Sequence, residues 1–155
     1  MSIRFVALNT SIVRALQEGQ PDANDQPPER RISDGNGVPC RLCLDQVEAG
    51  EPYLILAHRP FPAPQPYAEL GPIFLHAQAC ERHPGGANIP PILRSAQYLI
   101  RGYDSNDRIV YGSGQVVPTA SIPEIAAGMM RNERIAYVHV RSASNNCYQC
   151  RIDRE

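Results

Sequence analysis

Two Cys-x-x-Cys motifs contain the residues of this chain that are best suited to do chemistry. The first consists of Cys40 and Cys43, and the second, far along the chain, of Cys147 and Cys150. A spacer of two residues lets both thiolates of a pair bind one ion, and two pairs supply the four ligands of a closed tetrahedral zinc site. The sequence therefore predicts a zinc site formed by Cys40, Cys43, Cys147 and Cys150, which would close residues 44–146 into one large loop.

Other roles for these cysteines stay open. Free cysteine is among the most buried residue types, so the pairs could simply fill a core. A thiol redox protein that cycles the two Cys-x-x-Cys pairs is a second alternative, although the βαβ context of thioredoxin-like sites is missing. The glycine that usually accompanies a zinc knuckle is missing too. The chain has five cysteines, and this odd number argues against a complete disulfide framework.

His76, Cys80 and His83 form a second group of metal-compatible residues. If this segment were helical, His76 and Cys80 would share one face. They could then hold a catalytic metal, or place a reactive thiol beside an imidazole. We favour a strand end followed by a solvent-exposed loop, which leaves the role of the three residues open. Cys80 is the best candidate for a catalytic thiol.

A second candidate catalytic residue is His139, in the middle of a predicted strand. Alternation along that strand places it on the same face as Tyr137 and Arg141. An enzyme built on Cys80 or His139 would act on a small anionic or carbonyl substrate, because arginine can bind such groups bidentately. A solvated sheet face is the alternative. The candidate ligand-binding residues are Arg59, Tyr67, Arg101 and Arg141.

The elements that must position these residues are short. Six or seven strand-like segments and two short helices, without a βαβ rhythm, predict an α+β fold with a mostly antiparallel sheet. The strands are expected at residues 3–8, 53–57, 73–76, 97–103, 108–117, 135–140 and 148–152. The helices are expected at residues 10–17 and from 122 to about 132, the first capped by Thr10 or Ser11 and the second by Ser121. Residues 19–39, rich in proline and glycine, are expected to form a loop.

Length and composition limit the classes of function. The 155 residues fit a single domain, 1–155. The net charge of −1 gives no electrostatic footprint for nucleic acid or for an anionic membrane. No apolar stretch suits a membrane helix or a signal peptide, so we expect a cytoplasmic protein, whose thiols stay reduced. The chain has arginine but no lysine, which excludes Schiff-base chemistry through a side-chain amine.

Several motifs, in order along nearly the whole chain, resemble a bacterial family called domain of unknown function 1203. They lie at residues 40–44, 51–61, 66–69, 71–76, 101–104, 137–141 and 147–152. The resemblance implies one domain and no particular reaction, because the family has no assigned activity. We therefore expect a zinc-stabilised domain with a binding or scaffold role. A small-molecule ligand fits this expectation, and nothing in the sequence identifies a protein partner or decides whether the protein is an enzyme.

Overall fold

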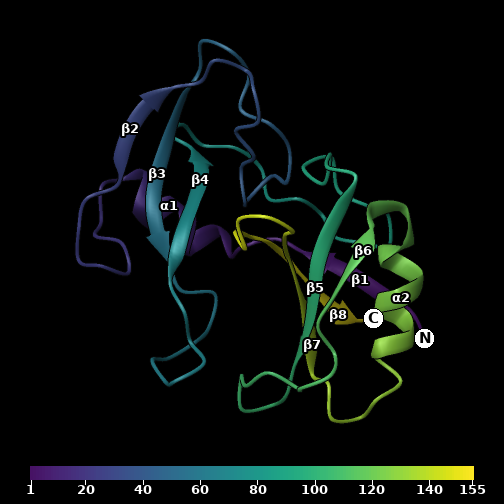
Figure 1. The fold of residues 1–155 in the computed structure, drawn as a ribbon. Helices are drawn as coiled ribbons and strands as arrows, with labels where there is room; N and C mark the ends of the chain where they lie inside the picture. The colour runs from purple at the N-terminus through teal and green to yellow at the C-terminus, as the bar shows by residue number, and fades with distance from the viewer.

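Two antiparallel β-sheets and two short helices make up the computed structural model, which describes residues 1–155 (Figure 1). The five-stranded sheet has the order β1-β8-β7-β5-β6 and the three-stranded sheet the order β2-β3-β4. The larger sheet contains β1 (Ile3–Val6), β5 (Gln97–Tyr103), β6 (Gln115–Pro118), β7 (Tyr137–Ser142) and β8 (Tyr148–Arg154). The smaller sheet contains β2 (Glu29–Ile32), β3 (Pro52–His58) and β4 (Gly71–His76). The predicted α+β class with antiparallel pairing is confirmed, with eight strands in two sheets in place of six or seven.

The first and last strands of the chain lie side by side. In the antiparallel pairing of β1 with β8, Ile3 lies opposite Arg154 and Val6 opposite Arg151. Main-chain hydrogen bonds of the larger sheet therefore hold the first strand of the chain against the last. The zinc site predicted from the sequence would have linked the two ends of the chain in a similar way, by closing residues 44–146 into one loop.

Each helix covers one of the two sheets (Figure 1). Helix α1 (Thr10–Gln17) occupies the predicted range, but its cap is Asn9, whose side chain accepts a hydrogen bond of 2.8 Å from the Ser11 N–H. Its buried residues Val13 and Leu16 belong to the core of the smaller sheet. Helix α2 (Ile122–Met129) follows a 3₁₀ turn, η1 (Thr119–Ser121), and packs on the larger sheet.

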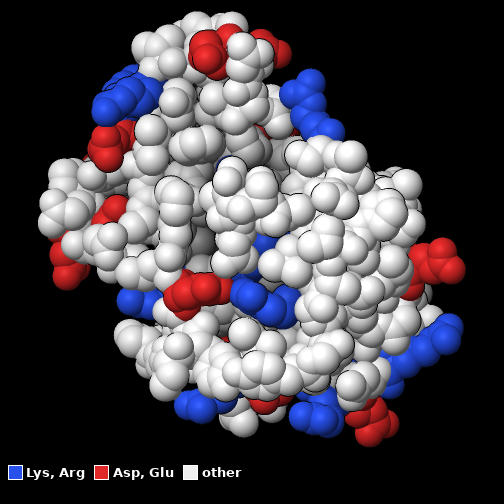
Figure 2. All heavy atoms as spheres, viewed as in Figure 1, with Lys and Arg blue, Asp and Glu red and all other residues white.

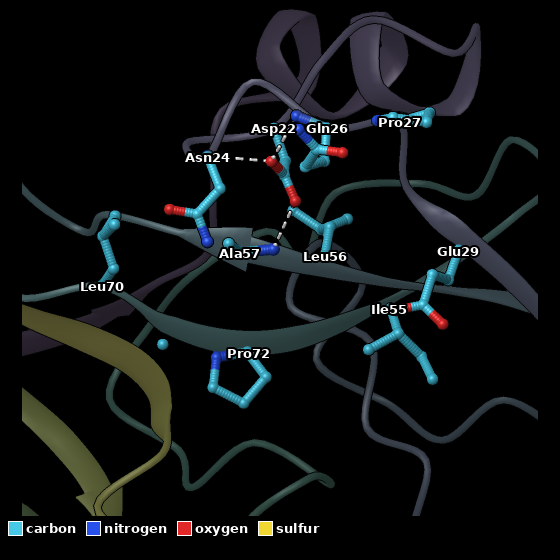
Figure 3. Close-up of a pocket in the computed structure, with 11 residues that line it drawn as sticks. Asp22, Asn24, Gln26, Pro27, Glu29, Ile55, Leu56, Ala57, Leu70 and Pro72 are labelled. Carbon is cyan, nitrogen blue, oxygen red and sulfur yellow. Dashed lines mark hydrogen bonds between the residues drawn. The ribbon is translucent and has the colours of Figure 1, made fainter.

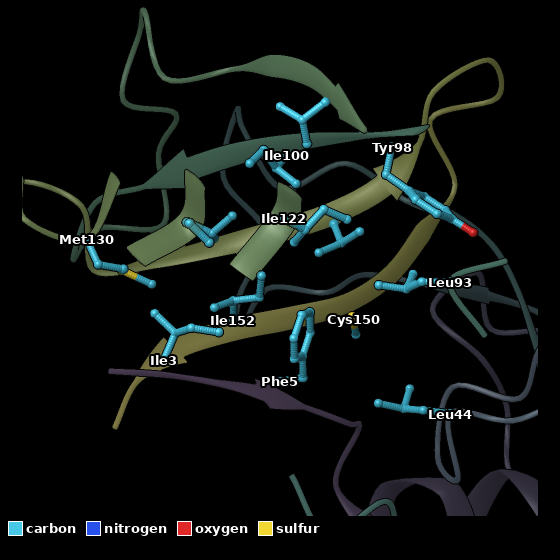
Figure 4. Packing of buried hydrophobic residues seen from close by; sticks show 14 of the residues in the cluster. Ile3, Phe5, Leu44, Leu93, Tyr98, Ile100, Ile122, Met130, Cys150 and Ile152 are labelled. Atoms are coloured by element: carbon cyan, nitrogen blue, oxygen red, sulfur yellow. The ribbon is translucent and has the colours of Figure 1, made fainter. Parts of the chain in front are cut away.

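The molecule has two main hydrophobic cores of different size. The larger sheet and α2 enclose 18 buried residues, and Figure 4 shows Phe5, Ile152 and Ile122 pointing into this core. The smaller sheet shares a core of 11 buried residues with α1 and the segment 38–47. All four residues of β2 are exposed, so the smaller sheet has little hydrophobic support at that edge.

Two predicted elements differ from the structure. The strand expected at 108–117 is present only at its end, as β6, because the residues before it fold into a loop. The carboxylate of Asp104 accepts hydrogen bonds from the N–H groups of Asn106 and Arg108, at 2.8 and 3.1 Å, and so stabilises a turn. Within the predicted loop 19–39, residues 29–32 form β2, which pairs with β3.

Candidate metal centre

Residues 39–46 form a tight hairpin that turns both cysteines of the first motif to one side. The Cys40 N–H donates to the Asp45 carbonyl at 2.9 Å, and the Leu44 N–H donates to the Cys40 carbonyl at 3.0 Å. Leu44 has a φ of 55°, in the left-handed region that usually calls for glycine. Its side chain is fully buried in the larger core, and this burial offsets the backbone cost. The turn therefore forms without the glycine whose absence counted against a zinc knuckle.

The hairpin lies along β4, which brings His76 close to it. Cys40 makes a parallel bridge with Phe74, and the Arg41 N–H donates to the Phe74 carbonyl at 3.2 Å. Strand β4 ends at His76, and the chain turns there without forming a helix. The N–H of His76 donates to the Cys40 sulfur at 3.3 Å.

Helix α1 holds the segment after β4 in place. The side-chain amide of Gln17 donates to the carbonyls of His76, at 2.9 Å, and Gln78, at 3.0 Å. The guanidinium of Arg14 donates to the carbonyl of Cys80 at 2.7 Å. These bonds position Cys80 beside the hairpin although nearly forty residues separate the two segments in the sequence.

Four ligand atoms meet at this place. The sulfurs of Cys40, Cys43 and Cys80 and a ring nitrogen of His76 all lie within 4.8 Å of one another. Cys40 Sγ is 3.8 Å from Cys80 Sγ, and Cys43 Sγ is 3.6 Å from His76 Nδ1. Tetrahedral zinc, with Zn–S bonds of about 2.3 Å and Zn–N bonds of about 2.0 Å, spaces its ligand atoms about 3.5–3.8 Å apart. The four residues can therefore hold a metal ion.

The closeness of the three sulfurs changes their pKa values. Hydrogen bonds from the thiols of Cys43 and Cys80 lower the pKa of Cys40 and outweigh its burial. The hydrogen bond to Cys40 raises the pKa of Cys43, and a hydrogen bond to Cys40 likewise raises the pKa of Cys80 to about 11. A hydrogen bond to Cys40 also raises the pKa of His76. Cys40 is therefore the thiol of the cluster that ionises first, and its thiolate would attract a cation.

The second Cys-x-x-Cys pair does not join this cluster. Cys150 lies in β8 and is buried in the larger core, where Figure 4 shows its side chain among apolar residues. Cys147 precedes β8, and its sulfur lies 3.8 Å from the Asn145 carbonyl. Cys150 is buried while Cys147, outside the strand, stays partly exposed, so the two are not held together as the first pair is. The group of residues that could hold a metal therefore comprises Cys40, Cys43, His76 and Cys80, and the structure brings neither Cys147 nor Cys150 of the four predicted cysteines into it together with the first pair.

The structure encloses the candidate catalytic residue His139 in an aromatic cluster. The residue is 1% exposed, and the rings of Tyr103 and Tyr148 lie 4.7 and 4.9 Å from its own. As predicted, it shares a sheet face with Tyr137 and Arg141, because Val138 and Val140 point into the core on the other face. In this conformation a substrate does not reach the imidazole.

The candidate ligand-binding residues lie in three different places. Arg101 and Arg141 converge on the carboxylate of Glu69, at 2.7 and 3.2 Å. Tyr67 instead bonds to the Tyr111 hydroxyl at 2.9 Å on the exposed surface. Arg59 lines a different groove, beside α1. His83 stays outside the metal cluster, where its Nδ1 accepts a hydrogen bond of 3.0 Å from the Gly85 N–H.

The largest cavity, of about 570 Å³, lies over the smaller sheet and away from the cysteines (Figure 3). Its acidic residue Asp22 accepts three main-chain hydrogen bonds, from Asn24, Gln26 and Ala57, at 2.9, 3.1 and 2.9 Å. Burial favours protonation of this carboxyl, but the three bonds prevail and lower its pKa. Asp22 therefore stabilises a turn, and the cavity has no reactive group comparable to the cluster.

The fold and the site together define an α+β protein with a Cys₃His candidate metal centre. Residues 37–154 match the family described as protein of unknown function (DUF1203), and the chain belongs to this family. All four residues of the centre lie within the matched segment. Comparison with curated proteins and with solved structures gives no match. Neither helix combines the length and the apolar character that crossing a membrane requires.

Proposed function

We propose that this protein is a zinc-stabilised domain with a binding or scaffold role. One zinc ion would be bound by Cys40, Cys43, Cys80 and the Nδ1 atom of His76. The observation that carries the proposal is the convergence of four ligand atoms within 4.8 Å of one another, with two separations, 3.8 and 3.6 Å, that match those of tetrahedral zinc. Three thiolates and an imidazole suit zinc among the common divalent metals. Four protein ligands leave no open coordination position, and this favours a structural role over catalysis.

The smaller sheet has the greater need for such an ion. Its core contains 11 buried residues against 18 for the larger sheet, and its edge strand β2 is fully exposed. A bound ion would close the loop between Cys43 and His76, which contains β3 and most of β4. Closing that loop restricts the unfolded chain and stabilises the fold.

The surroundings of the cluster also suit a metal. The Nε2 atom of His76 lies 3.7 Å from the Glu51 carboxylate, an arrangement that orients a ligating imidazole and raises its basicity. Three thiolates and one Zn²⁺ leave one negative charge in excess, and Arg14 and Arg41 lie close enough to stabilise it. Thiolates that must stay reduced suit the cytoplasm, where we place the protein.

Thermal unfolding with and without a strong chelator tests this function. Removal of zinc should cost at least about 5 kcal/mol, equivalent to a fall in Tm of about 10–20 °C for a chain of this length. Re-addition of zinc should restore the original Tm. An unchanged Tm in protein that has demonstrably lost its metal would contradict a structural role.

Thermal unfolding and alkylation of Cys80 separate the two alternative functions. In a thiol redox protein the clustered sulfurs, among them those of Cys40 and Cys80 at 3.8 Å, would cycle instead of holding a metal. Such a protein would show a Tm that responds to oxidant and not to chelator. An enzyme that uses Cys80 as a nucleophile needs this thiol free of metal, so an alkylating reagent should modify Cys80 at the same rate before and after chelation. Zinc binding predicts protection that the chelator removes.

A further inference from the structure

A small cavity lies between the two sheets, on the side away from α2. Its volume is about 150 Å³, or about five water molecules at ~30 Å³ each. Figure 2 shows a hollow between the two halves of the molecule in which acidic and basic side chains face one another. The polar residues that line it come from the end of β3, the segment before β4 and the β7–β8 turn, and include His58, Glu69, Arg141, Asn146 and Tyr148.

Arg141 presents an unsatisfied hydrogen-bonding edge in this cavity. The residue is 3% exposed, and only its Nη1 has a hydrogen-bond partner, the carbonyl of Asn146 at 3.2 Å. Its Nε and Nη2 atoms are buried without a partner. These two nitrogens form one edge of the guanidinium, the edge that binds carboxylates and phosphates bidentately. Buried donors are almost always satisfied, so an unpartnered edge points to a missing ligand.

Glu69 does not satisfy this edge. Its carboxylate lies 3.2 Å from Arg141 Nη2, but out of line for a hydrogen bond. Its shorter contact, of 2.7 Å, is with Arg101, and its side chain is 44% exposed. Two guanidinium groups against one carboxylate leave one positive charge in excess beside the cavity.

His58 offers a further donor. Its Nε2 atom is buried without a hydrogen-bond partner, and its ring lies 5.8 Å from that of Tyr148. Burial lowers the pKa of His58 to about 4, with the charges of Arg41 and Arg141 acting in the same direction. The imidazole is therefore neutral at pH 7, and in one tautomer its Nε2–H can donate to an oxygen in the cavity.

We propose that this cavity binds a small oxyanion, a carboxylate or a phosphate group, through the Nε–Nη2 edge of Arg141 and the Nε2 atom of His58. Glu69, at the rim of the cavity, competes with the bound anion, because its own carboxylate lies 3.2 Å from Arg141 Nη2. The volume of about 150 Å³ admits an anion of up to about five to seven non-hydrogen atoms, at roughly 20–30 Å³ per atom. The site uses none of the metal ligands, so it does not depend on the proposed zinc function.

Calorimetric titration of the protein as purified, with sodium acetate and with sodium phosphate at constant ionic strength in chloride, tests this site. Wild-type protein should bind at least one of the two anions with a Kd on the order of 1 mM. Glu69→Gln should bind about tenfold more tightly, because a like charge is removed while the shape is kept. Arg141→Lys keeps the charge but loses the bidentate edge, and should bind at least about tenfold more weakly. Arg131→Gln, which removes an exposed arginine beside α2, is the matched control and should bind as wild type.

The two anions distinguish the source of the ligand. Tighter binding of acetate indicates a carboxylate, and tighter binding of phosphate indicates a phosphate ester or free phosphate; either result supports the site. Binding of neither anion by wild type or Glu69→Gln up to about 10 mM would overturn the proposal. Anion affinities of Glu69→Gln equal to those of wild type would also overturn the proposal. Glu69→Gln changes only a half-exposed side chain, so this variant provides the test if Arg141→Lys does not fold.

Discussion

The Nε atom of Arg41 donates a hydrogen bond of 2.9 Å to the main-chain carbonyl of Tyr148. This bond joins the cysteine hairpin to the last strand of the larger sheet, since Arg41 stands between two of the proposed zinc ligands. The residue is 3% exposed, and its Nη1 donates to the Pro39 carbonyl at 2.6 Å. Burial lowers the pKa of Arg41 to about 10, so the guanidinium remains charged at neutral pH. The buried Arg41 side chain thus links the metal centre to the larger sheet, in addition to Leu44 of the same hairpin, which packs in the larger core.

Replacement of Arg41 by methionine should destabilise the protein by about 2–4 kcal/mol, because the buried carbonyl of Tyr148 and the partly buried carbonyl of Pro39 lose their donor. Urea-induced unfolding at pH 7.5 measures this change. Arg131→Met, at an exposed position, should stay within about 0.5 kcal/mol of wild type. A loss below about 1 kcal/mol for Arg41→Met would show that the bond to Tyr148 is not what joins the two sheets.

Glu51 is expected to tune the metal without binding it. Glu51→Gln removes the charge that faces the Nε2 atom of His76 at 3.7 Å, and zinc affinity should fall about tenfold. Competition with a chromophoric chelator measures this affinity. Glu48→Gln, an exposed acidic residue of the same turn, serves as the matched control and should leave it unchanged. Equal affinities for wild type and Glu51→Gln would argue against ligation of the metal through Nδ1.

Stability should depend on pH through His139. Burial, followed by the charges of Arg141, Arg151 and Arg101, lowers the pKa of His139 well below its usual value. The unfolded state therefore takes up a proton below about pH 6.5 that the folded state does not, and stability falls as pH falls. This single group should cost about 1.4 kcal/mol between pH 7.5 and pH 5.5.

His139→Phe should remove that part of the pH dependence. Nδ1 of His139 has no hydrogen-bond partner, and the ring is surrounded by aromatic side chains, so phenylalanine fits the site. Unfolding free energies of the two proteins at both pH values give the difference directly, and contributions from other titrating groups cancel. His83→Gln, at a partly exposed position, should change the dependence much less. If the unfolding free energies of wild type and His139→Phe change equally between the two pH values, the claim that His139 is buried in its neutral form is refuted.

Both halves of the metal centre could be recognised in the sequence, but their combination could not. The spacing of Cys40 and Cys43 predicts a metal site, whereas His76 and Cys80 are metal-compatible in the sequence but are better read there as a strand end and an exposed loop. The spacing of Cys147 and Cys150 looks identical to that of the first pair, yet a Cys-x-x-Cys motif chelates an ion only when the chain turns between its cysteines.

The fold class followed from the pattern of short strands, whereas the division into two sheets depends on long-range packing. Arg101 and Arg141 were predicted as ligand-binding residues, and the structure brings them together on Glu69. His58 was not predicted, because a histidine at the end of a strand carries no local signal. Its position in the cavity depends on how the smaller sheet lies against the β7–β8 turn.

The most direct test of the metal centre is the zinc content of natively purified protein, measured by elemental analysis for wild type, Cys80→Ser and Cys147→Ser. We predict about one zinc ion per chain for wild type and for Cys147→Ser, and a large loss of zinc for Cys80→Ser, since four ligands complete a structural site. Zinc that is lost from Cys147→Ser and kept by Cys80→Ser would contradict the Cys₃His centre and favour four cysteine ligands. Wild-type protein without zinc, and unable to take it up when reduced, would contradict the zinc site altogether.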